Sequence, residues 1–116
     1  MTIERLHPGP RMSQAVKHGN TLYLAGQVAK DEFATIEEQT VQVLEKIDAL
    51  LAEAGASKSS VLSAQVLLSN IADFAAMNSV YDKWIDPANP PARACYETRL
   101  ASPNLRVEII VVAALD

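Results

Sequence analysis

Two charged side chains stand in apolar stretches of the sequence, where a charge is costly. Arg93 follows the pair Pro90-Pro91 at the start of a strand-like run, and Glu108 is the single acid in the stretch RVEIIVVAA. Burying either charge without a partner costs several kcal/mol. Each side chain therefore needs an opposite charge, a ligand or contact with water.

Spacing alone leaves three interpretations of this pair open. Arg93 and Glu108 could form a salt bridge between adjacent strands, or both could reach water at strand ends. The functional alternative is an anion site, in which Arg93 holds a small carboxylate bidentately from a rigid strand at a subunit cleft. Glu108 would then be a base that orients a water molecule.

Cys95 is the only cysteine of the chain, so an internal disulfide is excluded. The two-residue period of a strand places it on the same face as Arg93 and Glu97. A nucleophilic cysteine needs a base nearby, and no local pattern brings His7 or His18 to it. We therefore expect Cys95 to be a small buried apolar residue rather than a covalent catalyst.

Composition limits the classes of protein that remain. The 116 residues suit one domain, spanning 1–116, and the net charge of −4 argues against a binder of nucleic acid through phosphate contacts. No apolar run approaches the length of a membrane span, so we expect a soluble, cytoplasmic protein. His7 and His18 lack partners at metal-ligand spacing, and no glycine-rich nucleotide motif occurs, so neither a metal site nor a cofactor is expected.

The remaining residues predict an α+β fold in the order β-β-β-α-β-α-β-β. The predicted strands are 2–6, 14–17, 21–28, 61–69, 92–99 and 106–113, and the predicted helices are 35–54 and a second one from the cap Asn70 to Ile85. Thr35 and Glu38 form the pattern of a capping box, and Gly55 is placed to end the first helix. Gly26 interrupts the third strand, which indicates a bulge or the close approach of another group.

Both helices are expected to cover one face of a mixed sheet. The second helix should bury a stripe made of Ile71, Phe74, Met77, Asn78, Tyr81 and Ile85. The last strand is apolar at both parities, so it should be buried on both faces. No helix is left to cover its second face, so we predict a homo-oligomer.

Several of these residues together resemble the Rid (YjgF-type, RidA-like) family of small trimeric enamine/imine deaminases. The most specific part is the run Pro91-Ala92-Arg93-Ala94-Cys95 with Glu108 fifteen residues after Arg93. The pair Gly26-Gln27 and the Asn78-x-x-Tyr81 spacing of the second helix add to it. The resemblance implies a chorismate-mutase-like α+β fold and a homotrimer with active clefts between subunits.

The resemblance also implies a role for each site residue. Arg93 would hold the substrate carboxylate, backbone groups at Gly26 and Cys95 would fix the substrate, and Glu108 would position the hydrolytic water. Asn78 and Tyr81 would form walls of the cleft. The implied reaction converts 2-imino and 2-enamino acids to 2-oxo acids and ammonia without a cofactor.

The N-terminal segment departs from the family pattern. Met12 stands where the family carries a substrate-contacting tyrosine, Arg11 is new, and the loop before Arg93 is shorter by about two residues. A divergent subgroup with other imino acid preferences is one consequence. A module that binds 2-oxo acids without turnover is the alternative, while the acidic net charge speaks against a third reading, ribonuclease activity. A protein-only role such as a chaperone, based on an exposed apolar surface, is a further possibility.

Overall fold

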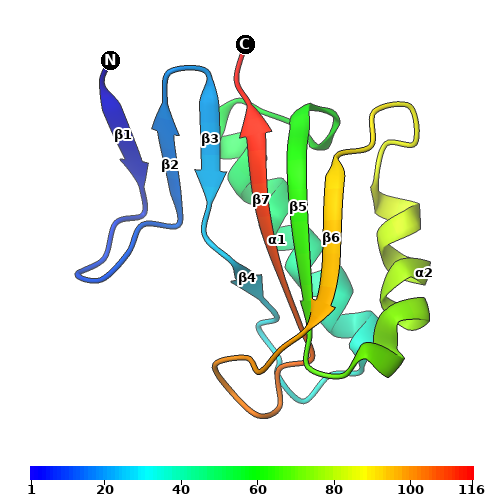
Figure 1. Ribbon diagram of the computed structural model, residues 1–116. Helices are drawn as coiled ribbons and strands as arrows, with labels where there is room; N and C mark the ends of the chain where they lie inside the picture. The colour runs from blue at the N-terminus through cyan, green and yellow to red at the C-terminus, as the bar shows by residue number, and fades with distance from the viewer.

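Seven strands form one mixed sheet, and two α-helices cover one of its faces (Figure 1). The computed structural model describes all residues, 1–116. The strands are β1 (Ile3–Leu6), β2 (Ala15–His18), β3 (Thr21–Leu24), β4 (Gln27–Val28), β5 (Val61–Leu68), β6 (Ala92–Glu97) and β7 (Val107–Ala114). The helices are α1 (Ile36–Ala54) and α2 (Phe74–Trp84), and short 3-10 turns precede β5 and α2 as η1 (Lys58–Ser60) and η2 (Ile71–Asp73).

The strands lie in the order β1-β2-β3-β7-β5-β6, and β4 also pairs with β7. Only β5 and β6 run parallel, joined by the crossover through α2, and every other pair is antiparallel. The predicted α+β class and the order of elements are confirmed, as is the position of both helices on one face. One predicted strand, 21–28, is divided into β3 and β4 at Ala25-Gly26.

The first helix forms where its caps and apolar period predict. The Thr35 side chain accepts a hydrogen bond from the Glu38 amide at 3.1 Å, so this half of the predicted capping box forms. Gly55 ends the helix with φ of 84°, a left-handed conformation that favours glycine. The predicted apolar stripe of α1 is buried against the sheet, including Thr40, whose hydroxyl donates to the Ile36 carbonyl.

Gln39 is a buried polar residue of α1 that the apolar period did not reveal. Its side-chain nitrogen lies 3.1 Å from three carbonyl oxygens, those of Glu32, Ala34 and Asn104. Its side-chain oxygen accepts from the Arg106 amide at 2.9 Å. This one side chain therefore ties the segment before α1 to the turn that precedes β7.

The second helix corrects one sequence prediction. Met77 and Tyr81 are buried as expected, but Ile71 and Phe74 are not: Phe74 is 43% exposed. Two features explain the difference. Residues 71–73 form a 3-10 turn, which shifts Ile71 off the predicted stripe, and α2 packs beside β6, the edge strand, where the sheet ends.

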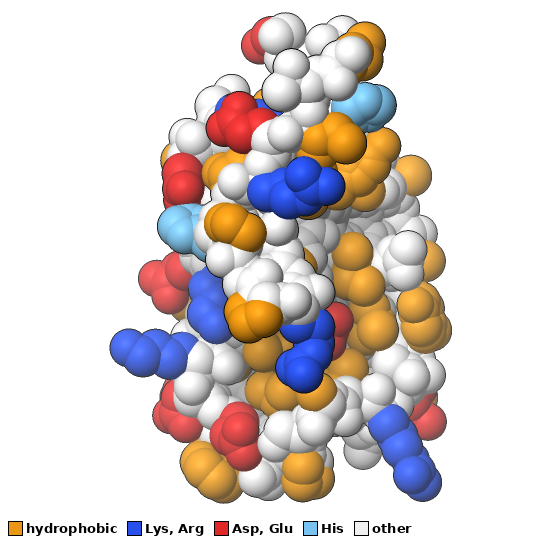
Figure 2. Space-filling view, turned by 90° about the vertical axis from the view of Figure 1, so that its left-hand side faces the viewer, with side chains coloured by type: hydrophobic (Ala, Val, Ile, Leu, Met, Phe, Trp, Pro, Cys, Tyr) orange, Lys and Arg blue, Asp and Glu red, His pale blue; other side chains and the backbone are white.

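The sheet face turned away from the helices is left open in the single chain. In β7 every second residue, from Val107 to Ala113, is buried under the helices, whereas Ile110 and Val112 point to the open face and are half-buried. Tyr23 on β3 is 47% exposed. Figure 2, a view onto the β1 edge, shows hydrophobic side chains gathered along the right-hand side, where this open face lies.

Neither helix has the length and apolarity needed to cross a membrane.

Candidate active site

Arg93 lies on the edge strand β6 and points to the helix side of the sheet. Its register partner on β5 is Ala64, which is buried beneath the helices. The Arg93 side chain donates from Nη1 to Asn78 Oδ1 at 2.8 Å. Its guanidinium carbon lies 4.8 Å from the ring centre of Tyr81 and 5.9 Å from that of Phe74. Three residues spaced by four and three positions on α2 therefore hold one guanidinium.

No carboxylate neutralises Arg93. The two ion pairs of the structure are His7–Glu53 and Arg106–Asp73. The hypothesis of an Arg93–Glu108 salt bridge is wrong, whereas the alternative of contact with water holds for Arg93, which is exposed in the single chain. Strand register explains why the salt bridge does not form. Glu108 pairs with Leu67 of β5, whereas Arg93 pairs with Ala64 of the same strand. Leu67 lies three positions after Ala64, and residues an odd number of positions apart on a strand point to opposite faces, so Glu108 lies on the open face.

Glu108 lies against the backbone of Gly26. An added Cβ at Gly26 would come within 2.9 Å of Glu108 Cδ and 3.2 Å of its Cγ, and closer still to Oε2. The prediction of a close approach at Gly26 is therefore confirmed. Val28 on β4 is the register partner of Glu108. Gly26 lies two positions before Val28, so it is on the same face of the sheet as Glu108.

A hollow of about 300 Å³ opens beside Arg93. Its other lining residues come from the last turns of α2 and from the loop before β6: Asn78, Tyr81, Asp82, Ile85, Pro90 and Pro91. It combines one cation, one acid, one amide and apolar walls. A small organic anion fits the volume and the charge of the guanidinium.

Burial raises the pKa of two side chains near Arg93, those of Tyr81 and Cys95. Burial raises the pKa of the Tyr81 hydroxyl, while the Arg93 guanidinium acts in the opposite direction. That hydroxyl is buried without a hydrogen-bond partner. Cys95 is half-buried rather than fully buried as expected. This burial raises the pKa of its thiol, while the charge of Arg93 acts in the opposite direction. A thiol kept neutral in this way is a poor nucleophile.

The single chain does not bring all the predicted site residues together. Arg93, Asn78 and Tyr81 meet on the helix side, with Cys95 two residues along β6. Gly26 and Glu108 meet on the open face. Met12 is 48% exposed in the loop between β1 and β2, and these strands lie at the opposite edge of the sheet from β6.

Sequence reasoning missed two residues of the Arg93 neighbourhood. Phe74 was expected in the core, and Asp82 was not singled out. The signal for Phe74 was present in its spacing to Asn78 and Tyr81, but an identical spacing also describes a buried stripe. Only the position of the edge strand β6 distinguishes a stripe buried in the core from a set of side chains that contacts Arg93.

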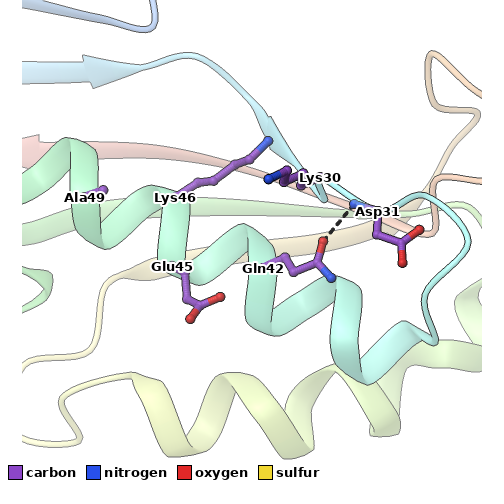
Figure 3. A pocket seen from close by; sticks show the side chains of 6 residues that line it. All are labelled: Lys30, Asp31, Gln42, Glu45, Lys46 and Ala49. Atoms are coloured by element: carbon purple, nitrogen blue, oxygen red, sulfur yellow. Dashed lines mark hydrogen bonds between the residues drawn. The ribbon is translucent and has the colours of Figure 1, made fainter.

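A larger hollow lies elsewhere, between the segment after β4 and the outer side of α1 (Figure 3). Its volume is about 550 Å³, and its lining residues are Lys30, Asp31, Gln42, Glu45, Lys46 and Ala49. Gln42 accepts a hydrogen bond from the Asp31 amide at 2.9 Å. The two lysines and two acids balance in charge, and none of the predicted site residues lies there.

Comparison with known proteins identifies a matching family model, related sequences and similar crystal structures. Residues 2–115 match the family model described as Endoribonuclease L-PSP. A RutC family protein from Haemophilus influenzae is 44% identical over 117 residues, covering 97% of this chain and 98% of the relative. The protein named Reactive Intermediate Deaminase A, chloroplastic, from Arabidopsis thaliana is 35% identical over 109 residues, covering 89% of this chain and 58% of that protein. The crystal structure of a YjgF family member from Neisseria meningitidis has a TM-score of 0.97 at 42% identity, covering 100% of this chain and 97% of that one.

Proposed function

Since the chain belongs to the Endoribonuclease L-PSP family, with the RutC and YjgF proteins among its relatives, we propose that it hydrolyses reactive 2-imino and 2-enamino acids to 2-oxo acids and ammonia. One observation carries the proposal: the Arg93 guanidinium is oriented beside an open hollow and has no acid partner. The name of the Arabidopsis relative, a reactive intermediate deaminase, supports the same chemistry.

Arg93 is the proposed anchor of the substrate carboxylate. A guanidinium has five N–H donors, and the bond to Asn78 uses one of them. A carboxylate can therefore take two parallel hydrogen bonds from the remaining donors. The rings of Phe74 and Tyr81 limit the orientations of the guanidinium, which reduces the entropy lost when the substrate binds.

Glu108 is the proposed base, and it must come from a second copy of the chain. Arg93 and Glu108 lie on opposite faces of the sheet, so one chain cannot present both to one small substrate. The open face that carries Glu108 is also the apolar face that no helix covers. A homotrimer that packs this face between subunits, with Met12 and Gly26 at the clefts, is part of the proposal.

The reaction then needs no cofactor. A proton added to C3 of the enamine gives the imine, whose protonated form is electrophilic at C2. Glu108 takes a proton from water as the oxygen forms its bond to C2. Protonated Glu108 returns its proton to the carbinolamine nitrogen. The C–N bond then breaks and ammonia leaves, while the hydroxyl loses its proton to solvent and the C2–O bond becomes a carbonyl. Orientation and charge placement are the contributions of the protein.

An oxidase-coupled assay tests the proposal. An amino-acid oxidase generates the imine, semicarbazide traps it, and an active protein lowers the rate of semicarbazone formation. We expect Arg93→Ala to raise KM by roughly tenfold or more, because a bidentate charged contact is lost. Arg99→Ala, which removes another exposed arginine, is the matched control. If the protein does not accelerate imine hydrolysis, and so does not lower the rate of semicarbazone formation, with any of several amino acids, the proposal is refuted. Full activity of Arg93→Ala would refute the role of that residue.

A binding module that holds 2-oxo acids without turnover is the second candidate. Met12 favours it, because the thioether offers no hydroxyl to the substrate. Calorimetry with 2-oxo acids beside the deaminase assay separates the two, since binding without turnover supports only this candidate. Ribonuclease activity, which the family description names, is not proposed because the chain has a net charge of −4 and its ten lysines and arginines are scattered along the sequence.

A further inference from the structure

Asp82 is the one acid that lines the hollow beside Arg93. It lies one helical turn after Asn78 on α2 and is exposed to solvent. It forms neither an ion pair nor a hydrogen bond, with Arg93 or with any other side chain. From this arrangement we infer that the Arg93 site accepts 2-imino acids with a single carboxylate and discriminates against those with a second carboxylate in the side chain. The inference rests on the proposed function and assigns its substrate class.

The charge of the hollow changes once a substrate binds. Arg93 is the only cation among the lining residues. When the substrate carboxylate occupies the guanidinium, the two charges cancel and Asp82 remains as an uncompensated negative charge. A second carboxylate in the same volume of about 300 Å³ then lies near a like charge, and the residues of this chain that line the hollow offer no second cation to bind it.

The other walls that this chain contributes carry no charge that could offset this repulsion. Pro90 and Pro91 have no backbone N–H to donate, and Ile85 is apolar. The free amide nitrogen of Asn78 is a neutral donor, and its oxygen is bonded to the guanidinium, so this amide is within reach of the first carboxylate. An uncharged side chain of similar length meets only apolar contact on these walls.

The field of Asp82 reaches the neighbourhood of Arg93. Burial is the main cause that raises the pKa of Tyr81, Arg93 opposes it, and the charge of Asp82 adds to the effect of burial. Both charges thus act on one hydroxyl at the wall of the hollow. A second substrate carboxylate placed there would feel the same negative field.

A matched pair of imines tests the inference. The oxidation of D-methionine and of D-glutamate gives 2-imino acids of similar length, one with an uncharged and one with a negative side chain. Because C2 of the imine is planar, oxidases of D-amino acids supply the same imines as those of L-amino acids. We expect kcat/KM for the glutamate imine to be lower by about fivefold or more, as expected for like charges several ångströms apart near a surface.

Asp82→Asn keeps the shape of the side chain and removes its charge. This variant is expected to reduce the difference in kcat/KM between the methionine imine and the glutamate imine, chiefly by raising kcat/KM for the glutamate imine. Glu45→Gln, at an exposed position on α1, removes the same unit of charge outside the Arg93 hollow and should leave the difference unchanged. Equal rates for both imines in the parent protein, or an unchanged difference in Asp82→Asn, would overturn the inference.

Binding measurements keep this test separate from that of the deaminase activity. Calorimetry compares 2-oxoglutarate with the 2-oxo acid of methionine in the parent protein and in Asp82→Asn. If no imine is turned over but the monocarboxylate binds more tightly and the preference falls in Asp82→Asn, the deaminase proposal fails and the charge selectivity stands. The absence of any preference in binding and in turnover would remove the selectivity.

Discussion

Replacing Gly26 by alanine tests whether this position makes room for the Glu108 carboxylate. The backbone of Gly26 lies outside the left-handed region, since only Gly19 and Gly55 have positive φ among the glycines, so alanine is compatible with the local conformation. The new Cβ would lie 2.9 Å from Glu108 Cδ and 3.2 Å from Cγ. Carbon atoms in ordinary contact are separated by roughly 3.5–4.0 Å, so the carboxylate must rotate away.

The cost of this rotation is modest, but its effect on turnover is large. Glu108 is half-buried and its carboxyl group is the far end of a flexible side chain, so we expect the free energy of unfolding to fall by about 1 kcal/mol. A base moved from its position loses most of a contribution of roughly 10²–10⁴-fold to the rate. We therefore expect kcat for imine hydrolysis to fall by at least about tenfold, with a smaller change in KM because Arg93, the proposed carboxylate anchor, keeps its contacts with Asn78 and Tyr81.

Two controls sharpen this experiment. Gly9→Ala introduces a Cβ whose nearest neighbour is the Met12 carbonyl oxygen at 3.5 Å, an ordinary contact, and should leave stability and kcat unchanged. Urea unfolding of Gly26→Ala, Glu108→Ala and the double variant measures the coupling between the two sites. Strictly additive stabilities, or a Gly26→Ala protein with the parent kcat, would refute the steric reasoning.

Three further predictions concern residues around the site and in the core. Phe74→Leu should raise KM roughly threefold, because the contact of the ring with the Arg93 guanidinium is lost. The free energy of unfolding in urea should change little, because Phe74 is half exposed. An unchanged KM would exclude a role of Phe74 in holding the guanidinium. Gln39→Leu should lower the free energy of unfolding by about 2–4 kcal/mol, because three carbonyls and one amide lose their buried partner, and thermal unfolding at parent stability would contradict this. The rate of Cys95 alkylation by iodoacetamide should rise with pH with a midpoint above that of a free thiol. Burial raises the pKa of Cys95, and the reactive thiolate forms only as the pH rises through that pKa. A midpoint at or below that of a model thiol would contradict this prediction.

Local patterns in the sequence determined most of the elements. The helix from Ile36 to Ala54 depends on Thr35, Gly55 and an apolar period, all of which act between neighbours along the chain. The turn at Gly19, where φ is 61°, has the same local origin. The residue types at Arg93 and Glu108 were also sufficient to identify two charges in need of partners.

Which partners those charges meet was decided only by the tertiary structure. β5 lies between β6 and β7, so Arg93 and Glu108 are on strands that do not pair with each other. Their partners on β5 are Ala64 and Leu67, an odd number of positions apart, which places the two charges on opposite faces. Register depends on long-range pairing, which a reading of neighbours cannot supply. The same reason applies to Gln39, whose partner at Arg106 lies 67 residues away. It also applies to Phe74, which contacts the Arg93 guanidinium because the sheet ends at β6.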